Sequence, residues 1–576
     1  MGGICSRKRD QPVYEDGLQR GVSRAYRKSG SSKWPGASFS RHVMDQLPGR
    51  TCPSLMELCI HKICEKIDEY SSFSVLPRDL SQQVFNELVN SQSLTEASLE
   101  AFRDCALLDV YLSEYPGVKD SWMDVVSSQG SSLLSIDISG SDVTDTGLVL
   151  LKDCSNLQEL TYDYCEQISE NGLKHISGLT NLTSLSFKKS NAITVEGMRA
   201  FSNLVNLEKL DLERCPWVHG GFVHLKGLTK LNYLNIRCCK CIGDLDMRAI
   251  SGLTNLKELQ VSNCNVTDSG VSYLRGLCKL IVLNLEGCNV TIASLDSISA
   301  IVSLESLNLN RCGLSDDGCD KFSGLKNLRV LSLGFNNITD ECLVHLKDLT
   351  NLESLNLDSC KIGDEGLSNL TGLPLKSLVL SDTEVGNNGL RHLSGFGHME
   401  NLNLSFTLIT DGGLKRLSGL TSIKSLNLDA RQISDSGLAA LKNLTGLRHL
   451  DLFAARISDS GMNYMRYFKN LQSLEICGGG LTDAGVKNIK DLASLTLLNL
   501  SQNCSLTDKT LEVISGLTAM VSLNVSNSRV TNEGLQHLKK FKNLRSLCLE
   551  SCKVTAAEIR KLQSTALPNL VSFRPE

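Results

Sequence analysis

The sequence predicts an α/β solenoid, in which a curved parallel β-sheet is backed by short helices and covered at its N-terminal end by an α-helical cap. Three observations lead to this prediction. A leucine pattern returns about every 24 residues, its units combine strand-like and helix-like spacing, and 576 residues exceed what one compact core accommodates. We therefore divide the chain into a disordered basic tail and linker (1–50), a helical cap segment (51–130) and a solenoid (131–576).

The repeat has the form L-x-x-L-x-L, with Ile, Val, Met or an aromatic residue allowed at the leucine positions. It occurs eighteen times, and LPNLVSF near residue 570 begins a truncated nineteenth copy. The copies begin at Leu133, Leu157, Leu182, Leu207, Leu231, Leu256, Leu280, Leu304, Leu328, Leu352, Leu375, Met399, Ile423, Leu447, Leu471, Leu495, Met520 and Leu544. Such regularity is the signature of a leucine-rich repeat solenoid.

A single unit, MENLNLSFTLITDGGLKRLSGLTS, explains why strand and helix share one interior. Leu402 and Leu404 alternate with polar residues, which predicts a short strand with one apolar face. Thr410 and Asp411 can cap a following helical turn, and further leucines recur at helical spacing. One unit cannot bury that face alone, so the units are expected to stack into a parallel sheet.

Eight units place cysteine at their ninth position, just after the predicted strand. We interpret this row as a structural ladder of small, weakly hydrogen-bonding side chains rather than a metal or redox site. No apolar run near the start is long enough for a signal peptide, so we expect a reducing cytosol in which disulfides are improbable. The eight residues are Cys165, Cys215, Cys239, Cys264, Cys288, Cys312, Cys360 and Cys552.

Charge is distributed unevenly along the chain. Residues 1–41 contain nine Lys or Arg and three Asp or Glu, so they carry a formal charge of +6 and the rest of the chain carries −10. An acidic body argues against a nucleic-acid partner, and a basic tail favours contact with an anionic surface.

The first ten residues, MGGICSRKRD, predict a lipid anchor. They fit the M-G-x-x-x-[ST] pattern for myristoylation of Gly2, and Cys5 is the candidate for palmitoylation as the second membrane signal. Arg7, Lys8 and Arg9 would add attraction to an anionic leaflet. We expect a tether to the cytoplasmic face of the plasma membrane or an endomembrane; the alternative is an ordinary disordered tail on a soluble cytoplasmic protein.

The segment before the repeats contains LPRDLSQQVFNEL, which is similar to the opening of an F-box. The matching residues are Leu76, Pro77, Leu80, Val84, Phe85 and Leu88. The resemblance implies that they bind a Skp-type adaptor of a cullin ubiquitin ligase. The next stretch, AFRDCALLDVYL, lacks the tryptophan that an F-box usually carries. The alternative is a helical cap over the first coil, and the two roles are compatible.

The repeats themselves also resemble a known class. The run CKIGDEGL from Cys360 to Leu367, with NCNVTDSGV and RCGLSDDGC, looks like the cysteine-containing subtype of leucine-rich repeat found in F-box substrate receptors. Together with the MGGIC start, the chain resembles a plant family of intracellular leucine-rich repeat proteins described as F-box/LRR-like. This resemblance implies the fold over residues 133–576.

No motif for catalysis or metal binding stands out. The chain has neither a G-x-x-x-x-G-K-[ST] phosphate loop nor an H-E-x-x-H zinc motif. Cys59 and His61 of the cap differ by two positions and so point to different helix faces, which disfavours zinc. We expect no enzyme activity and no cofactor.

The concave face of the sheet is the candidate binding surface. Eighteen strands about 4.8 Å apart give an arc on the order of 80 Å, which suits a protein partner. Asparagine recurs along it, which we interpret as a solvated ladder. The exceptions are Arg237, Arg311, Phe335, Phe406 and Phe453, residue types that anchor protein interfaces. The alternative for the phenylalanines is packing between coils. We therefore expect a non-enzymatic, membrane-tethered protein-binding scaffold, with a ubiquitin-ligase substrate receptor as the alternative.

Overall fold

A computed structural model describes residues 54–429 and 432–574 of the chain. The chain divides into two units, Met1–Leu47 and Pro48–Glu576, and only the second contains described residues. The predicted lipid-anchor residues Gly2, Cys5, Arg7, Lys8 and Arg9 lie outside the described residues.

The second unit contains one sheet of twenty parallel strands, each three residues long, and each strand pairs with the next in chain order. The strands are β1 (Asp109–Tyr111), β2 (Ser135–Asp137), β3 (Glu159–Thr161), β4 (Ser184–Ser186), β5 (Lys209–Asp211), β6 (Tyr233–Asn235), β7 (Glu258–Gln260), β8 (Val282–Asn284), β9 (Ser306–Asn308), β10 (Val330–Ser332), β11 (Ser354–Asn356), β12 (Ser377–Val379), β13 (Asn401–Asn403), β14 (Ser425–Asn427), β15 (His449–Asp451), β16 (Ser473–Glu475), β17 (Leu497–Asn499), β18 (Ser522–Asn524), β19 (Ser546–Cys548) and β20 (Ser572–Arg574).

Short helices return the chain from each strand to the next. The α-helices are α1 (Leu55–Glu65), α2 (Arg78–Asn90), α3 (Glu96–Glu100), α4 (Asp120–Ser127), α5 (Asp145–Val149), α6 (Glu170–Leu173), α7 (Val195–Met198), α8 (Asp244–Ile250), α9 (Asp268–Ser272), α10 (Leu295–Ile298), α11 (Asp340–Leu346), α12 (Leu390–Leu393), α13 (Asp411–Leu414), α14 (Asp435–Ala440), α15 (Asp483–Val486), α16 (Asp508–Ile514) and α17 (Ala556–Thr565). The 3-10 helices are η3 (Ile67–Glu69), η4 (Gly130–Ser132), η5 (Leu150–Asp153), η6 (Lys174–Gly178), η7 (Arg199–Asn203), η8 (Gly221–Leu225), η9 (Tyr273–Gly276), η10 (Ile292–Ser294), η11 (Cys319–Gly324), η12 (Gly366–Leu370), η13 (Lys415–Gly419), η14 (Gly461–Tyr467), η15 (Lys487–Ile489) and η16 (Gly534–Lys540).

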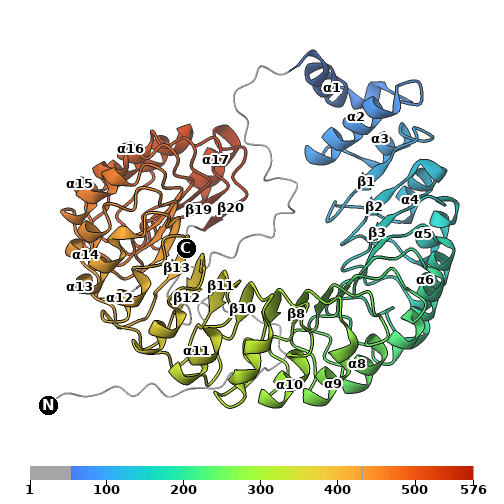
Figure 1. Cartoon of the computed structure of the whole chain (residues 1–576). Helices are drawn as coiled ribbons and strands as arrows, with labels where there is room; N and C mark the ends of the chain where they lie inside the picture. Colours follow the sequence, from blue (N-terminus) through green and yellow to red (C-terminus); the bar gives the residue numbers. More distant parts are fainter. Residues whose placement is uncertain (1–53, 430–431, 575–576) are drawn as a thin grey trace. The chain divides into compact units, whose positions relative to one another are not determined.

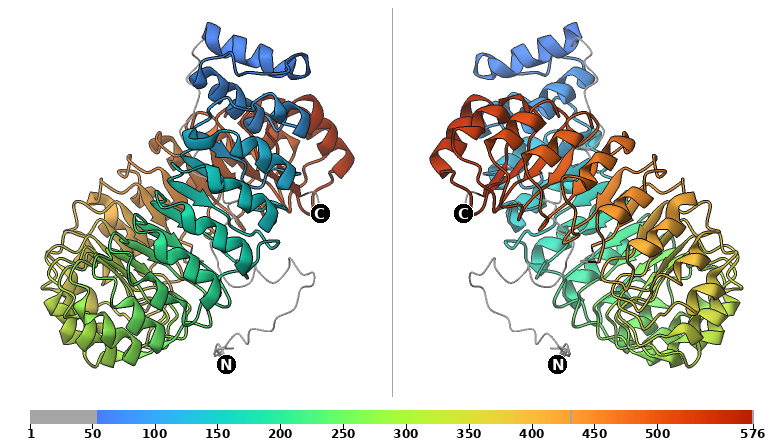
Figure 2. Two further views of the ribbon diagram at one scale, coloured as in Figure 1. Left: turned by 90° about the vertical axis from the view of Figure 1, so that its right-hand side faces the viewer. Right: turned by 90° about the vertical axis from the view of Figure 1, so that its left-hand side faces the viewer.

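Within this unit the strands line the inner side of the curve and the helices line the outer side (Figure 1). The side views show the helices stacked as one continuous outer layer (Figure 2). The leucines of strand and helix meet between the two layers, where Leu402, Leu404 and Leu414 are buried. This arrangement confirms the predicted solenoid, and none of the helices among residues 54–429 and 432–574 covers the inner face of the sheet.

The sheet begins one coil earlier than the sequence predicts. Strand β1 lies in the segment that was assigned to the helical cap, and its Val110 pairs with Ile136 of β2. Leu107, Val110 and Leu112 are buried and fill the three positions of the L-x-x-L-x-L pattern. The stretch AFRDCALLDVYL therefore departs from the F-box pattern because it enters the first coil of the solenoid.

Aspartates on the helix side join many of the coils to the next. Asp411, the first residue of α13, accepts hydrogen bonds from the backbone N–H of Ser434 (2.8 Å) and from its hydroxyl (2.5 Å), one coil further on. Thr410 makes no side-chain cap for α13. The expectation that both residues cap their own helical turn is therefore wrong for this unit, because the carboxylate is used between coils.

The cysteine row is a structural ladder, as predicted. Each thiol donates to a backbone carbonyl of the preceding coil, for example Cys215 to Phe187 (3.0 Å) and Cys264 to Ile236 (3.1 Å). The other six members make the same contact at 3.2 to 3.4 Å. Burial raises the pKa of Cys215 to about 12, so this thiol stays protonated and unreactive near neutral pH.

One pair of cysteines contradicts the expectation that disulfides are absent. Cys319 of η11 and Cys342 of α11 form a disulfide between consecutive coils. The remaining cysteines of the described part carry free thiols. Neither bonded residue belongs to the ladder, because both lie in the helical layer rather than after a strand.

Candidate functional site

The residue types predicted as anchors lie at a turn that repeats after each strand. Asn308, the last residue of β9, accepts the backbone N–H of Asn310 (3.0 Å), and Asn403 holds Ser405 in the same way (3.0 Å). Arg311, which follows this turn, has a left-handed backbone with φ of 58°. Such a conformation is uncommon for residues other than glycine. The hydrogen bond accepted by the asparagine side chain has a structural role, because it holds the turn that leads into this conformation.

The asparagine row is thus not simply a solvated ladder. Asn235, Asn499 and Asn524 are each the last residue of a strand, and all three are buried. Their side-chain oxygens accept hydrogen bonds from the backbone N–H groups two residues further along the chain. Asparagine suits the site because its oxygen fixes the turn while its amide nitrogen can reach a neighbouring coil, as Asn427 reaches Asp451 (3.1 Å).

Arg311 and Phe335 are brought together at the turns that follow two central strands of the sheet. They occupy the same turn position after β9 and β10, two strands that pair through Leu307 and Leu331. The guanidinium carbon of Arg311 lies 3.7 Å from the centroid of the Phe335 ring. This is a cation–π contact, and it holds both side chains together on the surface.

Phe335 and Phe406 are exposed rather than packed between coils. Their exposed fractions are 41% and 42%, and both have positive φ, at 60° and 55°. Phe406 lies three coils beyond Phe335, after β13, and the exposed Leu408 follows it closely in the chain. Val330, the first residue of β10, is also exposed, at 37%.

The other two predicted anchors occupy a different position of the turn. Arg237 and Phe453 each lie one residue before the left-handed position and are half-buried. The side chain of Arg237 donates through Nε to the hydroxyl of Ser262 (2.9 Å), and the backbone N–H of Phe453 binds Asp451 (2.9 Å). The structure therefore separates the five predicted residues into an exposed row, with Arg311, and a half-buried row, with Arg237.

The exposed row contains an aromatic residue that the sequence pattern did not single out. Tyr164 follows β3, has a φ of 59° and is 45% exposed. It immediately precedes Cys165, just as Arg311 precedes Cys312 and Phe335 precedes Asn336. Reading the residue before each ninth position of the repeat would have identified Tyr164.

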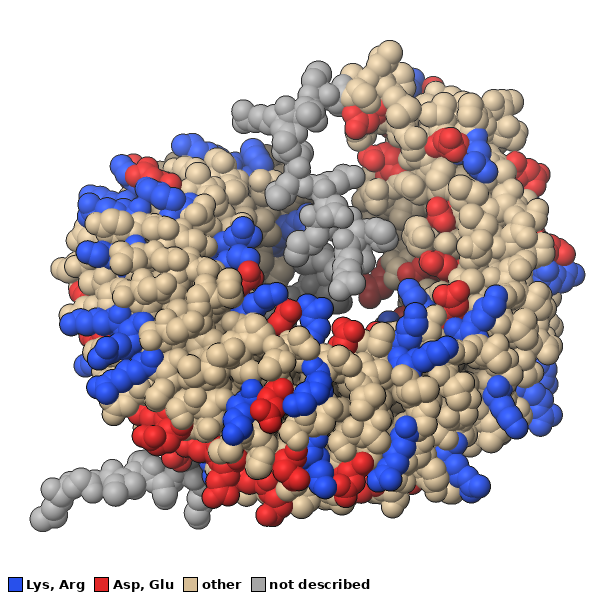
Figure 3. Space-filling model, viewed as in Figure 1, with Lys and Arg blue, Asp and Glu red and all other residues tan. Residues whose placement is uncertain are grey.

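Charged side chains accompany the exposed row towards both ends of the sheet. Lys188 lies between Asp163 (3.2 Å) and Asp211 (3.5 Å). Burial alone would lower the pKa of Lys188, but the two carboxylates outweigh it and raise the pKa. Figure 3 shows side chains of both signs of charge among broad uncharged areas on the face seen in Figure 1, with acidic side chains gathered along its lower edge.

A second charged group lies towards the C-terminal end of the sheet. Asp429, Asp451 and Glu475 come from the consecutive coils of β14, β15 and β16. Burial, followed by the nearby charge of Glu475, raises the pKa of Asp451 to about 8.

The F-box-like residues divide between the core and the surface. Val84, Phe85 and Leu88 are buried, and the ring of Phe85 lies edge-on to that of Phe102 with centroids 5.4 Å apart. Leu76 and Leu80 are half-buried, and Pro77 is exposed. Three of the six residues therefore build the core of the helical segment and have no surface to offer to an adaptor.

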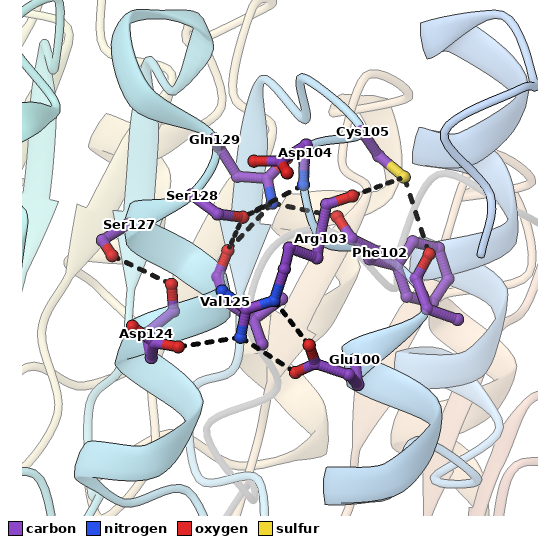
Figure 4. A network of polar contacts seen from close by, with 11 residues as sticks. Glu100, Phe102, Arg103, Asp104, Cys105, Asp124, Val125, Ser127, Ser128 and Gln129 are labelled. Atoms are coloured by element: carbon purple, nitrogen blue, oxygen red, sulfur yellow. Dashed lines mark hydrogen bonds and ion pairs between the residues drawn. The ribbon is translucent and has the colours of Figure 1, made fainter. Parts of the chain in front are cut away.

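Polar contacts attach this helical segment to the first coil (Figure 4). Arg103 binds Glu100, the last residue of α3, and also Asp124 of α4 (2.7 Å). The buried amide of Gln129 donates to the carbonyl of Phe102 (3.0 Å) and accepts the N–H of Leu107 (2.9 Å). These contacts are those of a cap fixed to the end of a solenoid.

One group of three side chains in the described part could in principle hold a metal ion. Asp316, Cys319 and Cys342 place one ligand atom each within 4.8 Å of the others. The two sulfurs are joined in the disulfide, and both carboxylate oxygens of Asp316 accept hydrogen bonds from Thr339 at 2.8 Å. The ligand atoms are thus already engaged.

Comparison with family models agrees with this architecture. A model described as Leucine rich repeat matches residues 302–362 and 469–530, and a second model of the same description matches 227–251 and 252–274. The fold is a leucine-rich repeat solenoid. No curated protein in the comparison matches the chain. None of the helices in the described part combines the length and apolar character that a membrane span requires.

The chain is similar to several solved structures, all of them distant in sequence. An internalin from Listeria monocytogenes is 23% identical, with 66% of this chain and 96% of that chain covered and a TM-score of 0.35. TLR13 in its complex with ssRNA13 is 20% identical, with coverage of 81% and 70% and a TM-score of 0.43. The plant peptide hormone receptor RGFR1, solved with RGF2, is 16% identical, with coverage of 77% and 89% and a TM-score of 0.30.

Proposed function

We propose that this chain is a non-catalytic scaffold that binds a protein partner on the inner face of its sheet and is tethered to the cytoplasmic side of a membrane through its N-terminus. The observation that carries the binding role is the exposed Arg311–Phe335 pair, with Phe406 in the same row. Leucine-rich repeats provide a rigid scaffold compatible with protein binding.

The pair has the properties of an interface anchor. Phe335 offers a ring that is 41% exposed, so a partner can bury much additional apolar area there. Arg311 stacks on that ring and can still direct its N–H groups to acceptors of a partner. Because both residues follow short paired strands, little conformational entropy is lost when a partner binds.

Affinity purification from cells with quantitative mass spectrometry tests the binding role. We expect proteins that are enriched with the wild-type chain to be lost with the double variant Arg311→Ala/Phe335→Ala. The matched control is Tyr467→Ala, because Tyr467 is an aromatic residue of the helical layer with a similar exposed fraction of 44%. Equal recovery by all three chains would contradict the proposal.

The membrane tether rests on the sequence alone. A first acyl chain would attach to Gly2 and a second to Cys5. The basic run Arg7, Lys8 and Arg9 would add electrostatic attraction to an anionic leaflet. Fractionation of a C-terminally tagged chain tests it. We expect Gly2→Ala to release the protein entirely and Cys5→Ser to leave weak, exchanging attachment. A wild-type chain that incorporates no myristate label would exclude the tether.

Substrate recognition for a ubiquitin ligase is the second candidate, and the surface position of Pro77 beside the half-buried Leu76 and Leu80 favours it. These residues lie at the start of α2, where an adaptor could reach them. Pull-down of a Skp-type adaptor by the wild type, with loss in Leu76→Ala/Pro77→Ala, would support this candidate. No recovery, under conditions in which a known F-box protein succeeds, would exclude it.

A further inference from the structure

The disulfide Cys319–Cys342 joins the two central coils of the solenoid. Cys319 is the first residue of η11 and Cys342 lies in α11, with 5.4 Å between their Cα atoms. The strands of the same two coils are β9 and β10. The bond therefore connects the coils that carry Arg311 and Phe335.

Both cysteines replace the residues that the repeat normally has at these positions. In the unit ITDGGL the second glycine is Gly413 and the next residue is Leu414. Aligned on this unit, Cys342 stands at the glycine position and Cys319 stands at the leucine position of the preceding coil. The two departures from the pattern thus fall in consecutive coils.

These two positions touch at several junctions between coils. A Cβ placed on Gly437 would lie 3.0 Å from a methyl carbon of Leu414, and one on Gly413 would lie 3.1 Å from Leu390. A leucine of one coil therefore packs against the glycine of the next. At the junction between β9 and β10 a bonded cysteine pair replaces this leucine–glycine contact.

The other thiols near this junction have a different chemistry. Cys312 and Cys360 belong to the ladder, in which each thiol donates to a carbonyl of the preceding coil. Burial raises the pKa of Cys312 to about 12 and that of Cys360 to about 11. Asp316 beside the pair is held by Thr339, so its carboxylate is committed to the link between coils rather than to a metal ion.

We propose that Cys319 and Cys342 form a redox-sensitive crosslink that stiffens the junction carrying the Arg311–Phe335 pair. In the oxidised chain the covalent bond adds to the hydrogen bonds between these coils. In the reduced chain two thiols occupy a position where the repeat otherwise has a packed methyl group, so the junction opens more often. The consequence for partner binding rests on the function proposed above, whereas the crosslink itself does not.

The chemistry requires a two-electron oxidant of the peroxide or disulfide class. With hydrogen peroxide, one thiol loses its proton and the thiolate attacks a peroxide oxygen; the O–O bond breaks, and the hydroxide that leaves takes up that proton, so a sulfenic acid and water result. The second thiolate attacks that sulfur and the hydroxyl leaves as water. Two thiols and one peroxide thus give one disulfide and two waters. A dithiol reductant reverses the state of the pair by thiol–disulfide exchange.

Hydrogen–deuterium exchange on the full chain tests the proposal without any partner. The chain is treated with hydrogen peroxide or with dithiothreitol, and the state of each cysteine is read by alkylation and peptide mass mapping. We expect amides of residues 309–346 to exchange about tenfold more slowly in the oxidised chain, because opening of the junction is suppressed. Amides of 401–440, where the junction has Leu414 and Gly437, should not change.

The control is the double variant Cys319→Leu/Cys342→Gly, which restores the ordinary pair of the repeat. It should fold, and its exchange over 309–346 should be the same in oxidant and reductant. Recovery of Cys319 and Cys342 as free thiols after oxidation would overturn the proposal. So would a fully formed disulfide that leaves exchange over 309–346 unchanged. If exchange responds but Arg311→Ala/Phe335→Ala binds partners normally, the crosslink stands and the proposed binding site fails.

Discussion

Gly437 illustrates how a single residue sets the spacing between coils. A Cβ at this position would overlap Oδ1 of Asp411, the carboxylate that binds Ser434. The equivalent residues Gly461 and Gly485 meet Asp435 and Asp459 in the same way. In these coils the glycine leaves room for the aspartate of the preceding coil, and it does not serve a special backbone conformation.

Gly437→Ala should consequently lower the free energy of unfolding by about 1 to 3 kcal/mol, because the added methyl group displaces the carboxylate from its hydrogen bonds. Urea denaturation followed by circular dichroism measures this. Gly419→Ala is the matched control, since nothing lies within 4 Å of a Cβ built on Gly419. Equal midpoints for the two variants would show that the glycine row does not control coil stacking.

The carboxyl of Asp451 makes the stability of the C-terminal coils depend on pH. Its pKa is raised from 3.8 to about 8, chiefly by burial and then by Glu475, with Asp429 contributing in the same direction. The folded chain therefore holds a proton that the unfolded chain releases above about pH 4. Between these two values the free energy of unfolding falls as the pH rises.

Asp451→Asn should remove this contribution, which amounts to at most about 1.4 kcal/mol per pH unit. The variant carries the residue that other coils have at this position, such as Asn427 and Asn499. Melting temperatures from pH 5 to 8 should fall less steeply for the variant than for the wild type. The exposed-site control Asp348→Asn should keep the slope of the wild type. If Asp451→Asn also keeps that slope, the raised pKa of Asp451 is contradicted.

Among the elements, the sequence predicts most of the coils because each has the same two leucine periodicities. The strand around Leu402 and the helical turn after Thr410 lie where the unit pattern places them. Strand β1 was missed although Leu107, Val110 and Leu112 fit the repeat pattern, because they lie in a segment whose start resembles an F-box. When the repeats are counted from Leu133 onward, a coil that lies before this residue is assigned to the preceding helical segment.

The binding face could be predicted only in part. Arg311, Phe335 and Phe406 were recognisable as bulky residues after strands, and all three are exposed. Their left-handed backbone and the stacking of Arg311 on Phe335 depend on contacts between coils, which one unit of sequence does not contain. The disulfide was missed for the same reason, because Cys319 and Cys342 become neighbours only when their coils stack.

The helical elements before β1 act as a cap, and Phe85 is the residue that tests this. Phe85 is buried in the cap core with Phe73 and Phe102. Phe85→Ala should lower the free energy of unfolding of the cap by about 3 to 5 kcal/mol. Pro77→Ala, at an exposed position, should have little effect. Limited proteolysis with mass mapping should then show cleavage between residues 54 and 105 in Phe85→Ala but not in Pro77→Ala. Protection of that region in Phe85→Ala would contradict the role of these helices as a cap.

In the molecule as a whole, the central coils combine three features. They carry the exposed Arg311–Phe335 pair, they are joined by a disulfide, and they lie between a charged group around Lys188 and another around Asp451. A partner that covers this region would bury the exposed Arg311–Phe335 pair and meet polar side chains of the neighbouring coils.

The dissociation constant of a partner recovered with the wild-type chain decides whether the inner face of the sheet is the binding surface. Titration calorimetry should compare the wild type, Phe335→Ala and Tyr467→Ala. We expect binding weaker by about 5- to 150-fold for Phe335→Ala, a loss of about 1 to 3 kcal/mol, with an unchanged melting temperature and unchanged affinity for Tyr467→Ala. Equal affinities for all three chains, or a loss that occurs only together with a lower melting temperature, would contradict this binding surface.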